Sequence, residues 1–256
     1  MLATIPQTLS HRAAVLHASL ERNLPMIMAG WVVLALTGGA LRVGFGPVGS
    51  GGAAISTVAP YVLLMAAPLV SMALAMRWFA HGDRLPQPQW RIARVGRWKA
   101  LDLGQAQAQP LYGTTGIMVS LLIGMLMNVP VRAAEYLVSI PAMLADVPDW
   151  LATLHFLMTV DVVLLPSLYV VAFVAALKRV PLFPRLLATV WLVDMTMQLV
   201  ILDRVSATDL PPEVGSALAT LLDGNIKKVM ISVALWAPYL VLSKRVNVTY
   251  RHRIPA

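Results

Sequence analysis

Long apolar runs alternate with short polar segments along the whole chain. Each run is close to the ~20 apolar residues that a helix needs to cross the hydrocarbon core of a bilayer. The runs cover residues 24–41, 53–76, 112–130, 150–177, 183–202 and 226–243. The pattern predicts an all-α, polytopic transmembrane bundle of six spans. An even number of spans puts both termini on the same side of the membrane.

The composition agrees with this class and excludes several others. Hydrophobic residues make up 58% of the chain and charged residues only 12%, whereas soluble domains carry about 25% charged residues. The chain has no cysteine, which excludes disulfides and thiolate metal sites. No catalytic or metal-ligating constellation stands in a usable context, so we expect no enzyme activity, no cofactor and no metal. No basic soluble domain is present that would bind nucleic acid.

The basic residues are unevenly distributed between the two sets of connecting segments. Fifteen of the 20 Lys and Arg residues fall in the N-terminal segment, residues 77–111, residues 178–185 and the C-terminal tail. By the positive-inside rule, this excess predicts that both termini are cytoplasmic. The other five basic residues are assigned to the opposite side: Arg42, Arg132, Arg204, Lys227 and Lys228.

The chain divides into three parts on this basis. Residues 1–23 form a cytoplasmic or interfacial segment, and residues 24–111 form a transmembrane hairpin followed by a basic cytoplasmic loop. Residues 112–256 form a four-helix membrane unit with a basic cytoplasmic tail. Within this unit, residues 131–149 carry Glu135, Pro141 and Asp146 among apolar residues. We expect an interfacial or re-entrant piece there.

The basic loop contains one segment in which aromatic and basic residues alternate. Its sequence WRIARVGRWK supplies Trp90, Arg91, Arg94, Arg97, Trp98 and Lys99. Juxtamembrane Lys and Arg attract anionic lipids by about 1 kcal/mol each. The segment is therefore a candidate contact for anionic headgroups; the alternative is that its charges only fix the topology.

Two aspartates interrupt the apolar runs near their centres. At 1.5 Å per residue, Asp161 and Asp194 lie at similar depths in neighbouring antiparallel helices. A charge at that depth costs at least ~2.5–3.5 kcal/mol on insertion scales, so we expect at least one of the two to be protonated. Gln198 shares the helix face of Asp194 and could donate a hydrogen bond. The pair indicates a proton or cation relay, neutral interhelical hydrogen bonds, or a contact with another subunit.

The C-terminal half also carries recognisable sequence motifs. The last run ends in WAPYLVLSKRVNVTY, and an upstream turn reads KRVPLFPRLLATVW. Over residues 112–250 these stretches resemble the YdgK-like family of uncharacterised bacterial inner-membrane proteins. The resemblance implies a multi-pass protein of the bacterial inner membrane and implies no activity. The residues that carry it are Phe183, Pro184, Trp236, Pro238, Tyr239, Ser243, Lys244, Arg245, Val246, Thr249 and Tyr250.

Three hypotheses for the function follow. Small loops and scattered polar residues favour a non-catalytic accessory or scaffolding subunit, whose partners would be other membrane subunits. A small-solute or proton-coupled transporter would use Asp161 and Asp194, and needs a polar cavity that reaches the midplane. Binding of anionic lipid through residues 90–99 is the third hypothesis.

Overall fold

The computed structural model describes residues 4–45, 55–89, 96–142 and 147–256. Six helices in this part of the chain are long and apolar enough to cross a membrane. The chain is therefore an all-α, multi-pass membrane protein, as predicted. The six helices are α1 (Thr4–Gly44), α2 (Ile55–Trp78), α4 (Met118–Ser139), α5 (Asp149–Leu177), α6 (Phe183–Ser206) and α7 (Pro212–Leu242).

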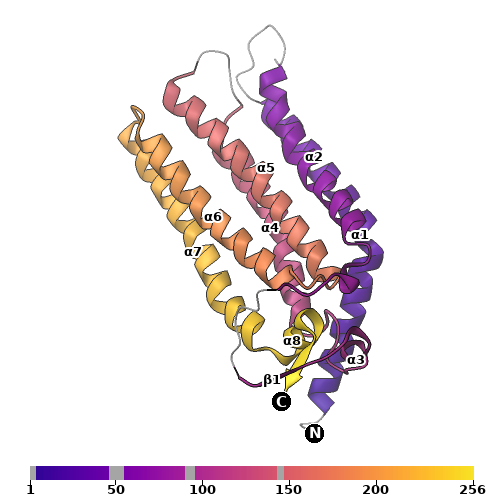
Figure 1. The fold of residues 1–256 in the computed structure, drawn as a ribbon. Coiled ribbons are helices and arrows are strands. Elements are labelled where there is room, and N and C mark those ends of the chain that lie inside the picture. The colour runs from indigo at the N-terminus through magenta and orange to yellow at the C-terminus, as the bar shows by residue number, and fades with distance from the viewer. Residues whose placement is uncertain (1–3, 46–54, 90–95, 143–146) are drawn as a thin grey trace.

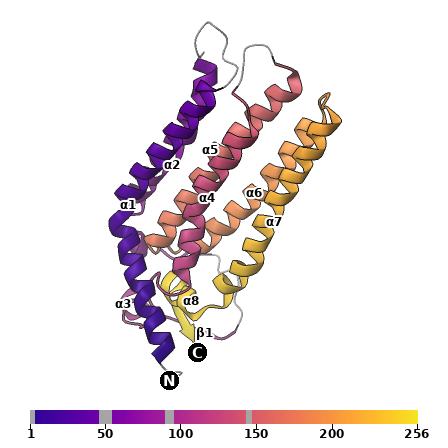
Figure 2. The same cartoon turned by 180° about the vertical axis from the view of Figure 1, so that it is seen from behind.

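Helix α5 forms the centre of the bundle. It packs against α2, α4 and α6, while α1 lies outside α2 and α4, and α7 lies outside α6. Figures 1 and 2 show α1 and α2 on one side of the bundle and α6 and α7 on the other. Apolar residues lie on all sides of α5, and this helix is the most buried of the six spans, as expected for a helix whose faces are all covered.

Helix α4 extends further than the apolar run predicted. It continues through Pro130 and ends at Ser139, so residues 131–139 of the expected interfacial or re-entrant piece at 131–149 belong to a membrane helix. Arg132 and Glu135 lie on this helix rather than in a loop, while Asp146 lies outside the described residues. Proline is tolerated inside membrane helices because neighbouring groups satisfy the freed backbone carbonyl.

The first helix is also longer than its apolar run. Helix α1 begins at Thr4 and passes without interruption through Pro25 into the predicted span. Two glycines let it approach its neighbours closely: a Cβ on Gly38 would lie 2.6 Å from Leu137, and one on Gly39 would lie 3.1 Å from Tyr61. Small residues at helix contacts are a common means of packing helices in membranes.

One end of the bundle carries a small folded cap. Strand β1 (Trp98–Ala100) pairs antiparallel with β2 (Arg253–Pro255), with Lys99 opposite Ile254. The cap also includes the short helices η1 (Gly82–Arg84), α3 (Leu103–Gln107) and α8 (Lys244–Arg251). Figure 1 shows both chain termini at this end. The predicted basic tail is therefore folded, and Tyr250 within it is fully buried against Phe183.

Candidate intramembrane charge cluster

An arginine from α4 lies between the two aspartates in the middle of the bundle. Arg132 Nη1 donates to Asp161 Oδ2 at 2.7 Å, and its Nη2 donates to Asp194 Oδ1 at 2.8 Å and Oδ2 at 2.9 Å. All three side chains are buried. One guanidinium therefore bridges α4, α5 and α6, which is the planar, forked geometry that arginine offers to carboxylates.

The remaining carboxylate positions are also hydrogen-bonded. The Tyr169 hydroxyl donates to Asp194 Oδ2 at 2.8 Å, and Gln198 Nε2 donates to Asp161 Oδ1 at 2.9 Å. Each of the four carboxylate oxygens thus accepts at least one hydrogen bond. Full satisfaction of this kind is required because an unpaired polar group is costly in a low-dielectric interior.

A chain of hydrogen bonds connects Asp161 with the surface of α7. Lys228 Nζ donates to Asn225 Oδ1 at 3.2 Å, and Asn225 Nδ2 donates to Gln198 Oε1 at 3.2 Å. Lys228 also forms an ion pair with Glu135 of α4. Because an ammonium can only donate, Lys228 sets the direction of every bond in this chain. Both amides are held so that Asp161 Oδ1 receives a donor.

A small cavity opens beside the cluster between α4 and α7. Its volume is ≈ 60 Å³, and its lining includes Arg132, Asp194, Tyr169, Asn225 and Lys228. A buried water needs roughly 10–15 Å³ of such space and two to four polar partners. The cavity therefore has room for water between the half-exposed Lys228 and Asp194, whereas Asp161 does not line it.

The formal charges of the cluster do not cancel. Arg132 contributes one positive charge and the two aspartates contribute two negative charges, while Lys228 and Glu135 balance each other. An uncompensated charge costs several kcal/mol in the interior of a protein. One proton or one monovalent cation would neutralise the cluster. In the described part of the chain, no three His, Cys, Asp or Glu side chains gather to hold a metal ion.

The structure brings together the three intramembrane residues predicted from the sequence, with one change. Asp161 and Asp194 do lie at the same depth, but Gln198 bonds to Asp161 rather than to Asp194 on its own helix. Arg132 lies between the two carboxylates and bonds to both, a counter-charge that the sequence analysis had assigned to the connecting segments on the opposite side.

The sequence analysis did not identify Arg132 and Asn225 as site residues, although the helical spacing of the apolar residues around them indicates that both are buried. The buried face of α4 recurs with helical spacing at Met125, Val129, Arg132 and Tyr136. The buried face of α7 recurs in the same way at Leu218, Leu222, Asn225 and Val229. A polar residue that falls in the register of an apolar face is directed into the core. Apolar run length alone does not detect it.

No family model, curated protein or solved structure matches this chain. The resemblance to the YdgK-like family stays a prediction.

The residues that carry the resemblance lie at the capped end of the bundle. Helix α6 begins at Phe183 with Pro184 in its first turn, as predicted. Helix α7 continues through Pro238, and the rings of Trp236 and Tyr239 meet edge to face at 5.9 Å. Ser243 caps α8 by accepting from the Val246 amide.

Three further motif residues of α8 also have defined positions. Lys244 is exposed, whereas Arg245 donates to Thr115 Oγ1 at 2.6 Å. Thr249 Oγ1 accepts from the Gly113 amide at 3.0 Å. These hydrogen bonds join the segment just before α4 to helix α8.

The predicted headgroup segment is only partly described. Trp90, Arg91 and Arg94 lie outside the described residues. Arg97 and Lys99 are exposed. The Arg253 guanidinium covers one face of the Trp98 ring at 4.8 Å.

Proposed function

We propose that this protein is a proton-coupled membrane carrier in which Asp194 binds and releases the exchanged proton. The observation that carries the proposal is a buried cluster with one excess negative charge beside a small polar cavity. Ionisable residues inside membrane bundles commonly mark proton or ion pathways. The accessory-subunit hypothesis relied on scattered polar residues, and the gathering of these residues at one site favours the carrier instead.

The hydrogen bonds distinguish the roles of the two aspartates. Asp161 is held as an acceptor by the amide chain that begins at Lys228, so a proton on its Oδ1 would force Gln198 and Asn225 to turn against the ammonium. Asp194 Oδ2 is bonded by the Tyr169 hydroxyl, which can donate or accept. We assign Asp161 as the permanent partner of Arg132 and Asp194 as the exchanging group.

Arg132 couples the proton to the helices. When Asp194 is ionised, the guanidinium is shared between α5 and α6. Protonation of Asp194 weakens its charge-assisted bonds, because such bonds are roughly twice as strong as neutral ones. The guanidinium is then held chiefly by Asp161. A proton thus changes how strongly α6 is tied to α4 and α5, which is the bias that a two-state carrier requires.

Infrared spectroscopy of the purified protein in liposomes tests the exchange step. We expect a carboxylic-acid carbonyl band that titrates with pH, that shifts in Asp194→Glu and that stays in place in Asp161→Glu. Asp194→Asn removes the band. Asp203→Asn is the matched control, because Asp203 is an exposed carboxylate on the same helix. If no titrating band of the unmodified protein is lost in Asp194→Asn, the proposal is refuted.

A pH jump on a solid-supported membrane tests the same site by its charge movement. The unmodified protein should give a transient current that Asp194→Asn abolishes and Asp203→Asn retains. If currents are absent and a stoichiometric partner copurifies in mild detergent, the accessory-subunit hypothesis replaces the carrier.

A further inference from the structure

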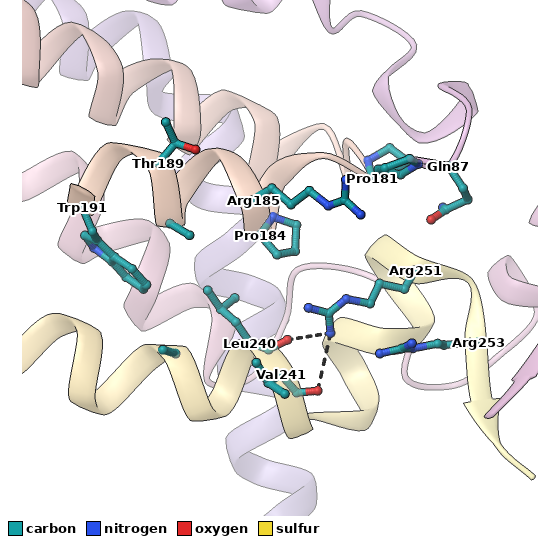
Figure 3. A pocket seen from close by; sticks show the side chains of 13 residues that line it. Gln87, Pro181, Pro184, Arg185, Thr189, Trp191, Leu240, Val241, Arg251 and Arg253 are labelled. Atoms are coloured by element: carbon teal, nitrogen blue, oxygen red, sulfur yellow. Dashed lines mark hydrogen bonds between the residues drawn. The ribbon is translucent and has the colours of Figure 1, made fainter. Parts of the chain in front are cut away.

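A second cavity lies at the capped end of the bundle, away from the charge cluster. Its volume is ≈ 480 Å³, within the range of small-molecule sites. It lies between the start of α6, the end of α7 and the cap. Figure 3 shows three arginine side chains around it: Arg185 from α6, Arg251 from α8 and Arg253 from β2. No carboxylate is among the described residues that line it.

Two of the three arginines, Arg251 and Arg253, are held in place by hydrogen bonds within the fold. Arg251 Nη1 donates to the Leu240 carbonyl at 2.8 Å, as Figure 3 shows, and to Asn247 Oδ1 at 3.0 Å. Arg253 Nε donates to the same oxygen at 2.7 Å. Asn247 is fully buried and therefore fixes both guanidinium groups on one side of the cavity. The positions of these two guanidinium groups are therefore fixed by the folded cap.

Two polar side chains on the cavity wall lack a partner among the described residues. In the described part of the chain, the Arg185 side chain has no hydrogen-bond or ion-pair partner, and Gln87 Nε2 on the cavity wall is buried without one. Burial, together with the neighbouring charges of Arg253 and Arg185, lowers the pKa of Arg251 to about 10. Three like charges around one cavity favour the binding of an anion.

The cavity has an apolar half as well. Trp191 lies eight residues into α6, so the cavity reaches ~12 Å from the capped end towards the membrane interior at 1.5 Å per residue. Pro184, Ala237 and Leu240 form the walls along this path. A free inorganic anion would use only the arginine half. A ligand that fills both halves has an anionic head and an apolar tail.

We propose that this cavity binds an anionic phospholipid, with its phosphate between Arg185, Arg251 and Arg253 and its acyl chain along Trp191. Arginine suits a phosphate because its forked donors bond two phosphate oxygens at once. None of the described residues 96–99 lines this cavity, and the proposal is independent of the proton exchange proposed at Asp194.

Ligand-induced stabilisation of the detergent-solubilised full chain tests this site. The probes are short-chain phosphatidylglycerol, short-chain phosphatidylcholine and inorganic phosphate. A ligand that binds only the folded state raises the melting temperature. We expect phosphatidylglycerol to stabilise the protein at far lower concentration than either other probe. Arg185→Gln should weaken this binding on the order of tenfold, as expected for one charge-assisted bond.

Two further variants make the test specific. Arg77→Gln removes an exposed arginine near the end of α2, outside the cavity, and should bind like the unmodified protein. Ala188→Trp fills the apolar half from an exposed position and should abolish phosphatidylglycerol binding. Arg251→Gln is less suitable, because Arg251 also bonds the end of α7.

The possible outcomes are separable. Equal binding by Arg185→Gln and the unmodified protein overturns the site. Inorganic phosphate as effective as phosphatidylglycerol, with Ala188→Trp unaffected, overturns the lipid in favour of a soluble anion. Equal stabilisation by phosphatidylcholine shows that the headgroup charge is not recognised, and also overturns the proposal.

Discussion

Removal of the arginine at the centre of the charge cluster should destabilise the protein more than removal of the whole set of charges. Arg132→Met leaves Asp161 and Asp194 buried with no counter-charge, and deletes three hydrogen bonds of 2.7–2.9 Å. Breaking a buried ion pair in this way costs about 3–5 kcal/mol. At 1.4 kcal/mol per factor of ten, the ratio of folded to unfolded protein falls roughly a hundredfold to a few thousandfold.

The triple variant Arg132→Met, Asp161→Asn, Asp194→Asn should recover much of this loss. It leaves no buried charge, and each asparagine keeps an oxygen that accepts from Gln198 or from Tyr169. Unfolding of each purified variant in the same detergent, followed by helical circular dichroism, measures the difference. Arg204→Met is the matched control, since Arg204 and its partner Asp203 are exposed, and its cost should stay within ~0.5 kcal/mol. An Arg132→Met variant as stable as the unmodified protein would refute the reasoning.

Three other predictions concern the ends of the bundle. A topology reporter fused after Ala256 should read cytoplasmic, and one inserted at Asp209 should read periplasmic. The reason is that fifteen of the 20 basic residues lie on the side of the termini. The reverse result would show that the predicted orientation is inverted. Gly82→Ala should lower the melting temperature, because its Cβ would lie 2.6 Å from the Lys178 carbonyl oxygen, whereas Gly30→Ala meets nothing within 4 Å and should not. Burial lowers the pKa of His252 below its usual 6.5. The folded cap therefore takes up a proton less readily than the unfolded chain does. The stability of the cap should fall as the pH drops below about 6.5. Amide exchange across residues 244–255 measures this effect, and it should vanish in His252→Asn, since asparagine also tolerates the left-handed conformation of that residue.

The two aspartates of the charge cluster could be predicted from the sequence, but its arginine could not. Asp161 and Asp194 stand out because a carboxylate in an apolar run is costly, and the constant rise of a helix gives their common depth. Arg132 did not stand out, because the apolar run ends near Pro130 while the helix continues to Ser139. Because the predicted helix ended a few residues too early, Arg132 was assigned to a loop instead of the membrane interior.

The cap and its cavity were not predictable in the same way. Strands β1 and β2 come from distant parts of the chain and have only three residues each. Arg185, Arg251 and Arg253 stand in different elements, and the sequence presents them as ordinary charges of a turn and a tail. Asn247 brings two of them together through side-chain bonds, and its place in the sequence resembles that of any polar tail residue.

By itself, the sequence determined the class of the protein, the number of spans and the depth of the two aspartates. The physical reason is that the hydrophobic effect and backbone hydrogen bonding act locally: an apolar run of sufficient length forms a membrane helix whatever its neighbours are. Only the tertiary structure decided which polar groups meet. Arg132, Asp161 and Asp194 come from three helices, and their pairing depends on how each helix is rotated about its axis. That rotation is set by packing against the other helices. The residues of a single helix do not contain this information.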